Sequence, residues 1–150
     1  RQEAVILAQK LQNLGICRIV SSDLKRARQT AEIISQAVGG VPVTIDKQLR
    51  ECTLGAIEGL TREEAKEKYG DGALVEWDDN ECKSYDFSSY GGENKAQVLR
   101  RHLAVLNDLP DCYHNEKTLL VGHGRGLNTL LASLGYPPNL ERGEYRVIEC

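Results

Sequence analysis

Three cations, Lys25, Arg26 and Arg28, lie where the sequence predicts the first turns of a helix that follows a short strand over residues 16–20. A helix N-terminus carries partial positive charge, so cations there cost a few tenths of a kcal/mol or more. A bound anion reverses this sign, because exposed N–H groups and a fixed guanidinium together form a phosphate site. The basic turn therefore indicates phosphate binding, with an ordinary solvated turn as the alternative.

His123 lies between two glycines, after the apolar run 118–121 that predicts a strand buried on both faces. Glycine allows the backbone to approach a ligand closely, and the N–H groups of the helix after it can face an anion. His123 and Gly124 are therefore candidate phosphate-binding residues. The alternative is a histidine that caps a turn. Arg125 is expected to be solvated and has no predicted role.

Glu51 follows a predicted strand over residues 41–45 and precedes a turn that contains Gly55. A carboxylate at this position can donate or accept a proton during a reaction. The alternative is a carboxylate that is simply solvated.

The histidines do not suggest a metal site. His102, His114 and His123 lack the spacing of metal-ligating pairs, and His102 is expected on the charged face of its helix beside Arg100 and Arg101. The chain also lacks the glycine-rich loop and lysine that cradle nucleotide phosphates in P-loop enzymes. We expect neither a required metal nor a cofactor.

Helices and strands are predicted to alternate along the chain, with a loop or lid over residues 77–90. Ser22 or Asp23 is expected to cap the helix that carries the three cations, and Thr61 with Glu64 forms a capping box for the next helix. The other predicted helices cover residues 1–14, 62–69, 94–109 and 127–134, and the strands cover residues 16–20, 41–45, 118–121 and 144–149.

This alternation predicts an α/β fold, a three-layer sandwich in which helices flank a mainly parallel sheet. Ligands of such sheets bind beyond the carboxyl ends of the strands. Since the basic turn and His123 both follow strands, we expect them to face one pocket despite their separation in the sequence.

Composition predicts one globular domain over residues 1–150. The chain has 41% hydrophobic residues and a net charge of -3, which favours neither nucleic acid nor a membrane surface as partner. Without an apolar span or a signal peptide, a cytoplasmic location is expected. The five scattered cysteines are expected to be thiols that mainly pack, and the oligomeric state is open. With 0 methionines, the chain is expected to continue upstream of Arg1.

Five blocks, in order, resemble the histidine phosphatase superfamily, which has the phosphoglycerate mutase-like fold. The run Ser-Ser-Asp-Leu-Lys-Arg-Ala-Arg-Gln-Thr-Ala at residues 21–31 is the closest match. The others are Arg-Gln-Glu-Ala at 1–4, Leu-Arg-Glu at 49–51 with Gly55 and Glu58-Gly59, Gly-Gly-Glu-Asn at 91–94, and Val-Gly-His-Gly at 121–124. The resemblance covers essentially the whole chain.

The resemblance implies phosphoryl transfer through a phosphohistidine to a small phosphorylated metabolite. It implies that Arg26, His123 and Gly124 bind the phosphoryl oxygens and that Glu51 protonates the leaving oxygen. These residue types suit the reaction, because preorganised cations stabilise the transferring group and an alkoxide needs a proton. The family's nucleophile lies in an N-terminal Arg-His-Gly strand that these 150 residues lack, so we expect it upstream of Arg1. The chain alone is expected to be inactive.

Within the family, a phosphatase is favoured over a mutase. Trp77 resembles part of the mutase insertion, where two arginines that bind phosphoglycerate follow the tryptophan. Here Asp78 and Asp79 follow it, and they would repel an anionic substrate group. A non-catalytic relative that binds a phosphorylated ligand or a protein, and a cofactor-dependent phosphoglycerate mutase, are the alternatives.

Overall fold

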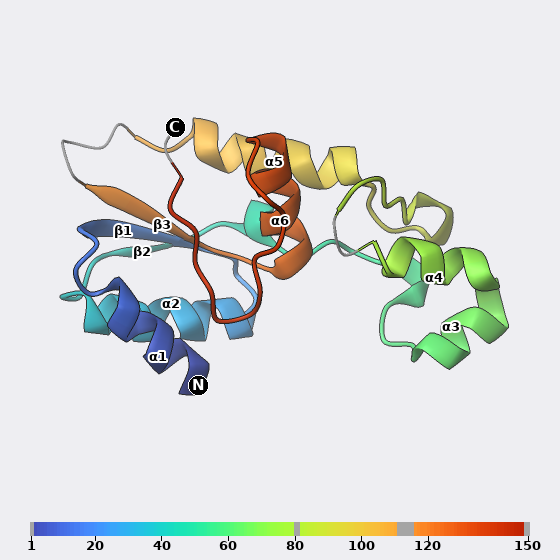
Figure 1. Ribbon diagram of the computed structural model, residues 1–150, viewed down its shortest axis with the longest axis horizontal. Coiled ribbons are helices and arrows are strands. Elements are labelled where there is room, and N and C mark those ends of the chain that lie inside the picture. The colour runs from blue at the N-terminus through green and yellow to red at the C-terminus, as the bar shows by residue number, and fades with distance from the viewer. Residues whose placement is uncertain (1, 80–81, 111–115, 149–150) are drawn as a thin grey trace.

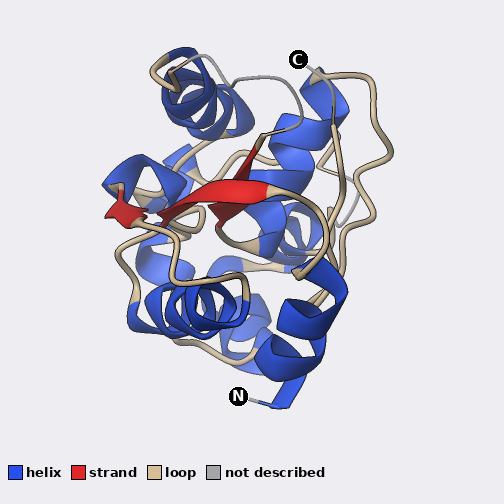
Figure 2. Cartoon of the chain, turned by 90° about the vertical axis from the view of Figure 1, so that its left-hand side faces the viewer, coloured by secondary structure: helices blue, strands red, loops and turns tan. Residues whose placement is uncertain are grey.

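The computed structural model describes residues 2–79, 82–110 and 116–148. Three helix and strand layers make up its larger part (Figures 1 and 2). The central sheet has the strand order β2-β1-β3, and both pairings are parallel. The strands are β1 (Ile16–Ser21), β2 (Val43–Ile45) and β3 (Lys117–Val121). The predicted α/β sandwich with a parallel sheet is confirmed.

Helices cover both faces of the sheet. In Figure 1, α1 and α2 lie below it and α5 and α6 above it, while α3 and α4 lie apart at one end. The helices are α1 (Gln2–Leu11), α2 (Lys25–Ala37), α3 (Arg62–Tyr69), α4 (Asp71–Trp77), α5 (Lys95–Asn107) and α6 (Gly124–Ser133). Short 3-10 turns are η1 (Lys47–Leu49), η2 (Gly55–Ile57) and η3 (Ser88–Tyr90).

Most predicted elements are found, with differences at the ends and at two segments. Helix α4 was not predicted, and the strand predicted over residues 144–149 is wrong, because the described part of it, residues 144–148, has no regular structure. Strand β3 is only partly buried over residues 118–120, rather than buried on both faces. It is an edge strand among those described, so its outer side has no described neighbour to cover it.

The helix starts show which capping predictions hold. Thr61 and Glu64 form the predicted capping box of α3. Asn94 and Gln97 form a second one at α5. The predicted cap of α2 is wrong: the N-cap residue is Leu24, without a side-chain cap. The Ser22 hydroxyl instead accepts a hydrogen bond from the Leu24 N–H at 3.3 Å. It also contacts the ring of His123, which lies just after β3.

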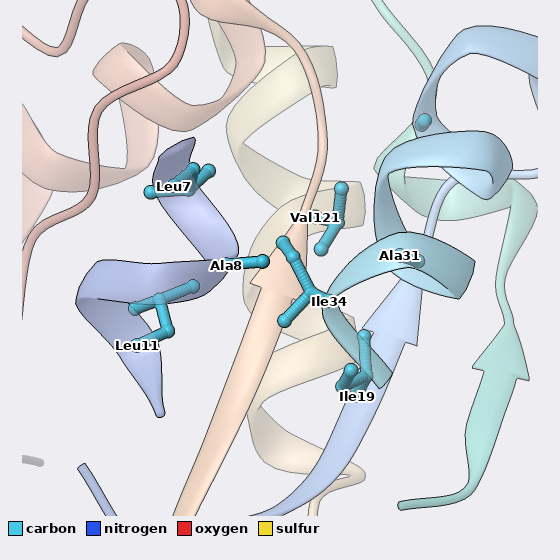
Figure 3. Packing of buried hydrophobic residues seen from close by; sticks show 8 residues of the cluster. Leu7, Ala8, Leu11, Ile19, Ala31, Ile34 and Val121 are labelled. Carbon is cyan, nitrogen blue, oxygen red and sulfur yellow. The ribbon is translucent and has the colours of Figure 1, made fainter. Parts of the chain in front are cut away.

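The main core lies between the sheet and the helices α1 and α2. Figure 3 shows Leu11, Ile34 and Ile19 packing between these elements, each at most 1% exposed. Their burial, together with Ala31 from the stripe of α2, fixes this helix against β1 and thereby sets the position of its first turn.

A second apolar cluster joins α3 and α4 to the segments around residues 52–57 and 82–87. Helix α5 connects the two parts, because its Val98 packs in this cluster and its Val105 packs with Val20 of β1 and with Leu49, on the face of the sheet opposite to α1 and α2. The glycines of two motif blocks lie where these segments cross. A Cβ at Gly92 would lie 2.4 Å from the Thr53 carbonyl oxygen, and one at Gly55 would meet Tyr90 O. Only glycine permits this crossing.

The prediction that His102 lies on the charged face of its helix is wrong. The side chain is fully buried between α5 and α6. Its Nδ1 is 2.9 Å from the Val98 carbonyl oxygen, and a Cβ at Gly126 would lie 2.5 Å from its Nε2. Burial lowers the pKa of His102, so the ring is held neutral. The imidazole therefore serves as a packing element between the two helices.

Within the described part of the chain, none of the helices has the length and apolar character needed to cross a membrane.

Candidate functional site

The parallel register brings the predicted site residues to one edge of the sheet. Ser21 at the end of β1 is aligned with Ile45 of β2 and with Val121 of β3. The segments that follow these strands carry Arg26, Glu51 and His123 respectively. The basic turn and His123 thus meet at this edge as expected, but the cavity described below is lined by Glu51 and Gly124 and not by Arg26 or His123.

Arg26 and His123 are in direct contact. The Arg26 Nε–H donates to His123 Nδ1 at 3.1 Å. His123 Nε2 lies 2.9 Å from Ser22 Oγ, and the ring is 6% exposed. Because an arginine can only donate, Nδ1 must be the unprotonated nitrogen, and Nε2–H then donates to Ser22. The sequence had suggested Ser22 only as a helix cap, and its role as a partner of His123 was missed.

The electrostatics of this pair favour a neutral imidazole while no anion is bound. Burial lowers the pKa of His123, and the charge of Arg26 lowers it further, although Glu51 acts in the opposite direction. An anion placed beside Arg26 and His123 would stabilise the protonated form of the ring, in which both nitrogens of His123 carry a hydrogen and can donate. The pair is thus suited to hold a group whose negative charge is spread over several oxygens.

Glu51 and Gly124 line a common cavity of about 250 Å³, whose walls also include Asp79, Arg125 and Asn128. The Cys52 N–H donates to Glu51 Oε1 at 2.9 Å, which orients the carboxylate. Gly124 is the first residue of α6 and is exposed, with no heavy atom within 4 Å of the position of a Cβ. Glu51 thus borders a space large enough for a small molecule at the N-terminal end of α6.

The loop before Glu51 is also tied to the basic turn. Arg50 and Asp23 form two parallel hydrogen bonds of 2.7 and 2.6 Å, which join the η1 segment to the β1–α2 loop. The hydrogen bond from Arg50 lowers the pKa of the Asp23 carboxyl group. Lys25 and Arg28, the other two cations of the basic turn, are exposed on α2. Neither takes part in the contacts of His123 described above.

The prediction that Arg125 is solvated is wrong, because its side chain forms part of the cavity wall. Its guanidinium lies 4.8 Å from the centre of the Tyr85 ring and 5.3 Å from that of Phe87. It also donates to the Trp77 carbonyl oxygen at 2.9 Å. These contacts join α6 to the 77–87 loop, and no local sequence pattern announces them because the partners are about 40 residues away.

Arg101 and Glu93 form a further pair next to Glu51 that the sequence analysis did not assign. The Arg101 Nε–H donates to Glu93 Oε1 at 2.8 Å, and its other nitrogens reach backbone carbonyls of the 48–51 segment. The glutamate of the Gly-Gly-Glu-Asn block was a signal that could have drawn attention to this pair.

Two of the three histidines fall in the described part of the chain, and His114 lies outside it. His102 is buried in packing, and His123 has both ring nitrogens engaged. Over residues 2–79, 82–110 and 116–148, no group of three or more His, Cys, Asp or Glu side chains could hold a metal ion.

From the contact between Arg26 and His123, we expect sulfate to bind this site more weakly as the pH rises. The pKa of His123 is lowered in the free site and should rise when a dianion binds, so binding takes up a proton between these two values. The affinity should be highest at low pH and fall by up to about tenfold per pH unit within that window. Titration calorimetry between about pH 5 and pH 8 measures this slope.

The His123→Gln variant is the control for this measurement. It keeps a polar side chain but cannot take up the proton, so it should bind sulfate weakly with a flatter pH dependence. An unchanged slope in the variant would show that another group accounts for it.

Comparisons with known proteins agree with this geometry. The probable phosphoglycerate mutase GpmB of Erwinia tasmaniensis is 36% identical over 144 residues, which are 94% of this chain and 64% of that protein. The GpmB protein of Yersinia enterocolitica is 35% identical over 148 residues, again 94% and 64%. The chain thus spans slightly less than two thirds of the length of these curated relatives.

Solved structures share the fold. The mycobacterial glucosyl-3-phosphoglycerate phosphatase Rv2419c, in complex with VO3, matches with a TM-score of 0.75 and 28% identity, over 93% of this chain and 70% of that one. Bacillus stearothermophilus YhfR matches with a TM-score of 0.72 and 29% identity, over 92% and 66%. The sequence profile of the family matches residues 1–146. By this match, the chain belongs to the histidine phosphatase superfamily, branch 1.

Proposed function

We propose that the protein containing this chain is a metal-independent phosphatase that hydrolyses a small phosphomonoester through a phosphohistidine. The nucleophilic histidine is proposed to lie outside these 150 residues. Arg26, His123 and Gly124 bind the phosphoryl oxygens, and Glu51 is the general acid. The observation that carries the proposal is the Arg26–His123 contact at the strand ends, next to the cavity that Glu51 borders.

The proposed reaction has two steps. In the first, the imidazole nitrogen forms a bond to phosphorus while the ester P–O bond breaks, and the Glu51 carboxyl group gives its proton to the departing oxygen. In the second, water attacks phosphorus, Glu51 takes a proton from it, and the P–N bond breaks to release phosphate. Arg26 and protonated His123 offset the negative charge of the phosphoryl oxygens in both steps.

The test is hydrolysis of p-nitrophenyl phosphate by the full-length protein in the presence of EDTA. We expect turnover that EDTA does not reduce, and quenching with an alkaline denaturant during turnover should trap phosphate on a histidine, because the P–N bond survives base but not acid. A correctly folded protein without turnover would favour the non-catalytic alternative. Activity that is lost with EDTA and restored by a metal would refute the metal-independent mechanism.

Phosphoglycerate mutase activity is the second candidate. Two observations favour it: the GpmB relatives are named as probable phosphoglycerate mutases, and the cavity wall includes the cation of Arg125. Against it, Asp79 lines the same cavity, although its carboxylate already accepts N–H groups from residues 83–85. Asp78, the other anion, forms an ion pair with Arg62. Interconversion of 2- and 3-phosphoglycerate, with the bisphosphate primer added, distinguishes the two activities.

A small phosphorylated metabolite as substrate and a cytoplasmic location stay predictions from the sequence.

A further inference from the structure

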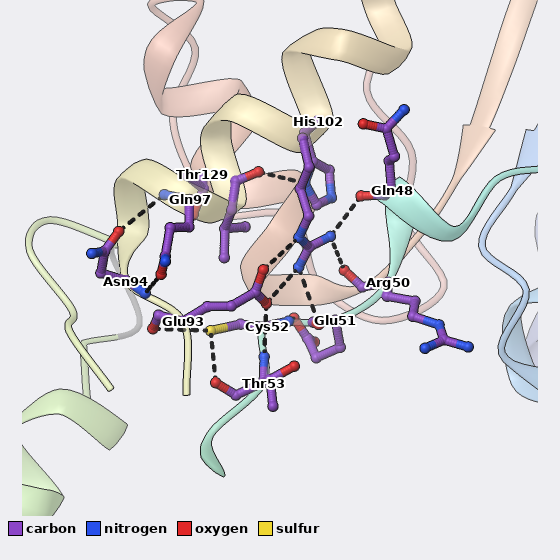
Figure 4. Close-up of polar contacts among 12 residues, drawn as sticks. Gln48, Arg50, Glu51, Cys52, Thr53, Glu93, Asn94, Gln97, His102 and Thr129 are labelled. Carbon is purple, nitrogen blue, oxygen red and sulfur yellow. Dashed lines mark hydrogen bonds and ion pairs between the residues drawn. The ribbon is translucent and has the colours of Figure 1, made fainter. Parts of the chain in front are cut away.

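Arg101 of α5 holds the backbone that carries Glu51. Figure 4 shows Gln48, Arg50 and Glu51 of this backbone close to Glu93. One of the terminal nitrogens of Arg101, Nη1, donates to the carbonyl oxygens of Gln48 and Arg50, each at 2.6 Å. The other, Nη2, donates to the carbonyl oxygen of Glu51 itself at 3.1 Å. One side chain thus binds three carbonyls within four residues of irregular chain.

Glu93 fixes the orientation of this guanidinium. Its two carboxylate oxygens accept from Arg101 Nε at 2.8 Å and from Nη2 at 3.0 Å. The same carboxylate accepts the Thr53 N–H at 3.0 Å, two residues after Glu51. The segment around Glu51 is therefore held on both sides by one partly buried ion pair, whose side chains are 17% and 24% exposed.

The pair is anchored to the rigid part of the molecule. Arg101 lies on α5 between Val98 and Val105, which pack in the two different apolar clusters. Burial opposes the ionised form of Glu93, but the hydrogen bonds from Arg101 and Thr53 outweigh it and hold the pKa of Glu93 below its ordinary value. Both partners are thus charged at neutral pH, and the link is a charge-assisted one.

Glu51 lies in irregular chain that is held by Arg101 and, through the Arg50–Asp23 pair, by the β1–α2 loop. Its residue lies after η1 and before η2, in a stretch without helix or strand, and its Oε1 bonds to the neighbouring N–H of Cys52. A general acid must lie within hydrogen-bond reach of the oxygen that it protonates, and a displacement of about 1 Å can reduce the rate about 100-fold. The direction in which Glu51 points is therefore decided by what its backbone is bound to.

We propose that Arg101, oriented by Glu93, is a positioning residue that aims Glu51 at the departing oxygen of the substrate. The proposal rests on the proposed function, because it assumes that Glu51 is the acid. In this role Arg101 acts through the three carbonyls, and its described hydrogen bonds do not involve Arg26 or His123. Besides burial, its charge contributes to the lowered pKa of His123, and Arg101→Lys keeps that charge.

The substitutions Arg101→Lys and Glu93→Gln test this in the full-length protein. A lysine keeps the charge but cannot bridge three carbonyls and a carboxylate, and the glutamine keeps the shape but loses the ion pair. With an alkyl phosphate, whose leaving alkoxide needs a proton, kcat/KM, which reports the first step only, should fall about 100-fold. With p-nitrophenyl phosphate, whose leaving phenolate needs little protonation, it should fall less than about tenfold.

Three further measurements separate positioning from general damage. In Arg101→Lys, the inhibition constant of inorganic phosphate should stay within about twofold, since the charge near His123 is kept and the Arg26–His123 hydrogen bond does not involve Arg101. The limb of the alkyl phosphate pH profile that reports the acid should be lost. Circular dichroism and thermal unfolding show whether the variants are folded. Arg100→Lys, on the exposed neighbouring position of the same helix, is the matched control and should leave all values unchanged.

The outcomes distinguish the two proposals. Equal losses with both substrates in folded variants, or no loss at all, would overturn the positioning role and leave the phosphatase intact. A folded wild-type protein that hydrolyses neither substrate would overturn the proposed function itself. Should Arg101→Lys fail to fold, the milder Glu93→Gln variant decides by the same comparison.

Discussion

Replacement of Arg26 by alanine is expected to lower kcat/KM for p-nitrophenyl phosphate about 10²–10³-fold in the full-length protein. The guanidinium lies at the start of α2 and contacts His123 at 3.1 Å, so it is placed to offset charge that develops on the phosphoryl oxygens. A loss of this size corresponds to about 3–4 kcal/mol of transition-state stabilisation. Steady-state kinetics measure it directly.

Arg28→Ala is the matched control for Arg26. It removes an exposed cation from the same helix and should change kcat/KM by less than about twofold. The double variant Arg26→Ala with His123→Ala should be hardly worse than either single one, because residues that bind one group together are not additive. Full activity in Arg26→Ala or His123→Ala would refute the assignment of the phosphate site.

The substitution Glu51→Gln is expected to reduce kcat/KM for an alkyl phosphate about 10²–10⁴-fold, the usual contribution of a general acid. This constant reports the first step, in which the leaving oxygen departs, and not the later attack of water. Glutamine has nearly the same shape, so the hydrogen bond from the Cys52 N–H to the side-chain oxygen can be kept. It has no acidic proton to give to the departing oxygen. With p-nitrophenyl phosphate the loss should be clearly smaller, because the phenolate leaves without much protonation.

Glu67→Gln on the exposed side of α3 is the control, and it should leave both substrates unaffected. A Glu51→Gln variant with equal losses for the two leaving groups would contradict the role of Glu51 as an acid. It would suggest instead that the carboxylate orients water or binds the substrate.

Local patterns were sufficient to predict most of the helices and strands. Apolar periodicity located α1, α2 and α5, and the capping box at Thr61 and Glu64 located α3. Helix α4 was missed, because glycines at 70 and 72 interrupt any helical pattern and its stability comes from packing against α3 and the second apolar cluster. The strand expected over residues 144–149 failed for the opposite reason: an apolar alternation forms a strand only where a neighbour pairs with it.

The candidate site divides in the same way. Arg26, Glu51 and His123 could be predicted because each follows a strand, and a parallel sheet places the residues after its strands at one edge. The roles of Arg101, Arg125 and His102 could not, since their partners lie 8 to 53 residues away, or in a neighbouring helix, and depend on how α5 and α6 pack.

The sequence by itself determined the family and the α/β architecture, and it predicted the residues that we propose to bind a phosphoryl group, because these follow from motif blocks and periodicity along the chain. Only the tertiary structure decided how these residues are held: the tautomer of His123, set by Arg26 and Ser22, and the backbone of Glu51, set by Arg101. The physical reason is that hydrogen bonds and burial depend on which distant segments meet. The energy of such contacts depends on distance and desolvation in space, which no spacing along the chain records.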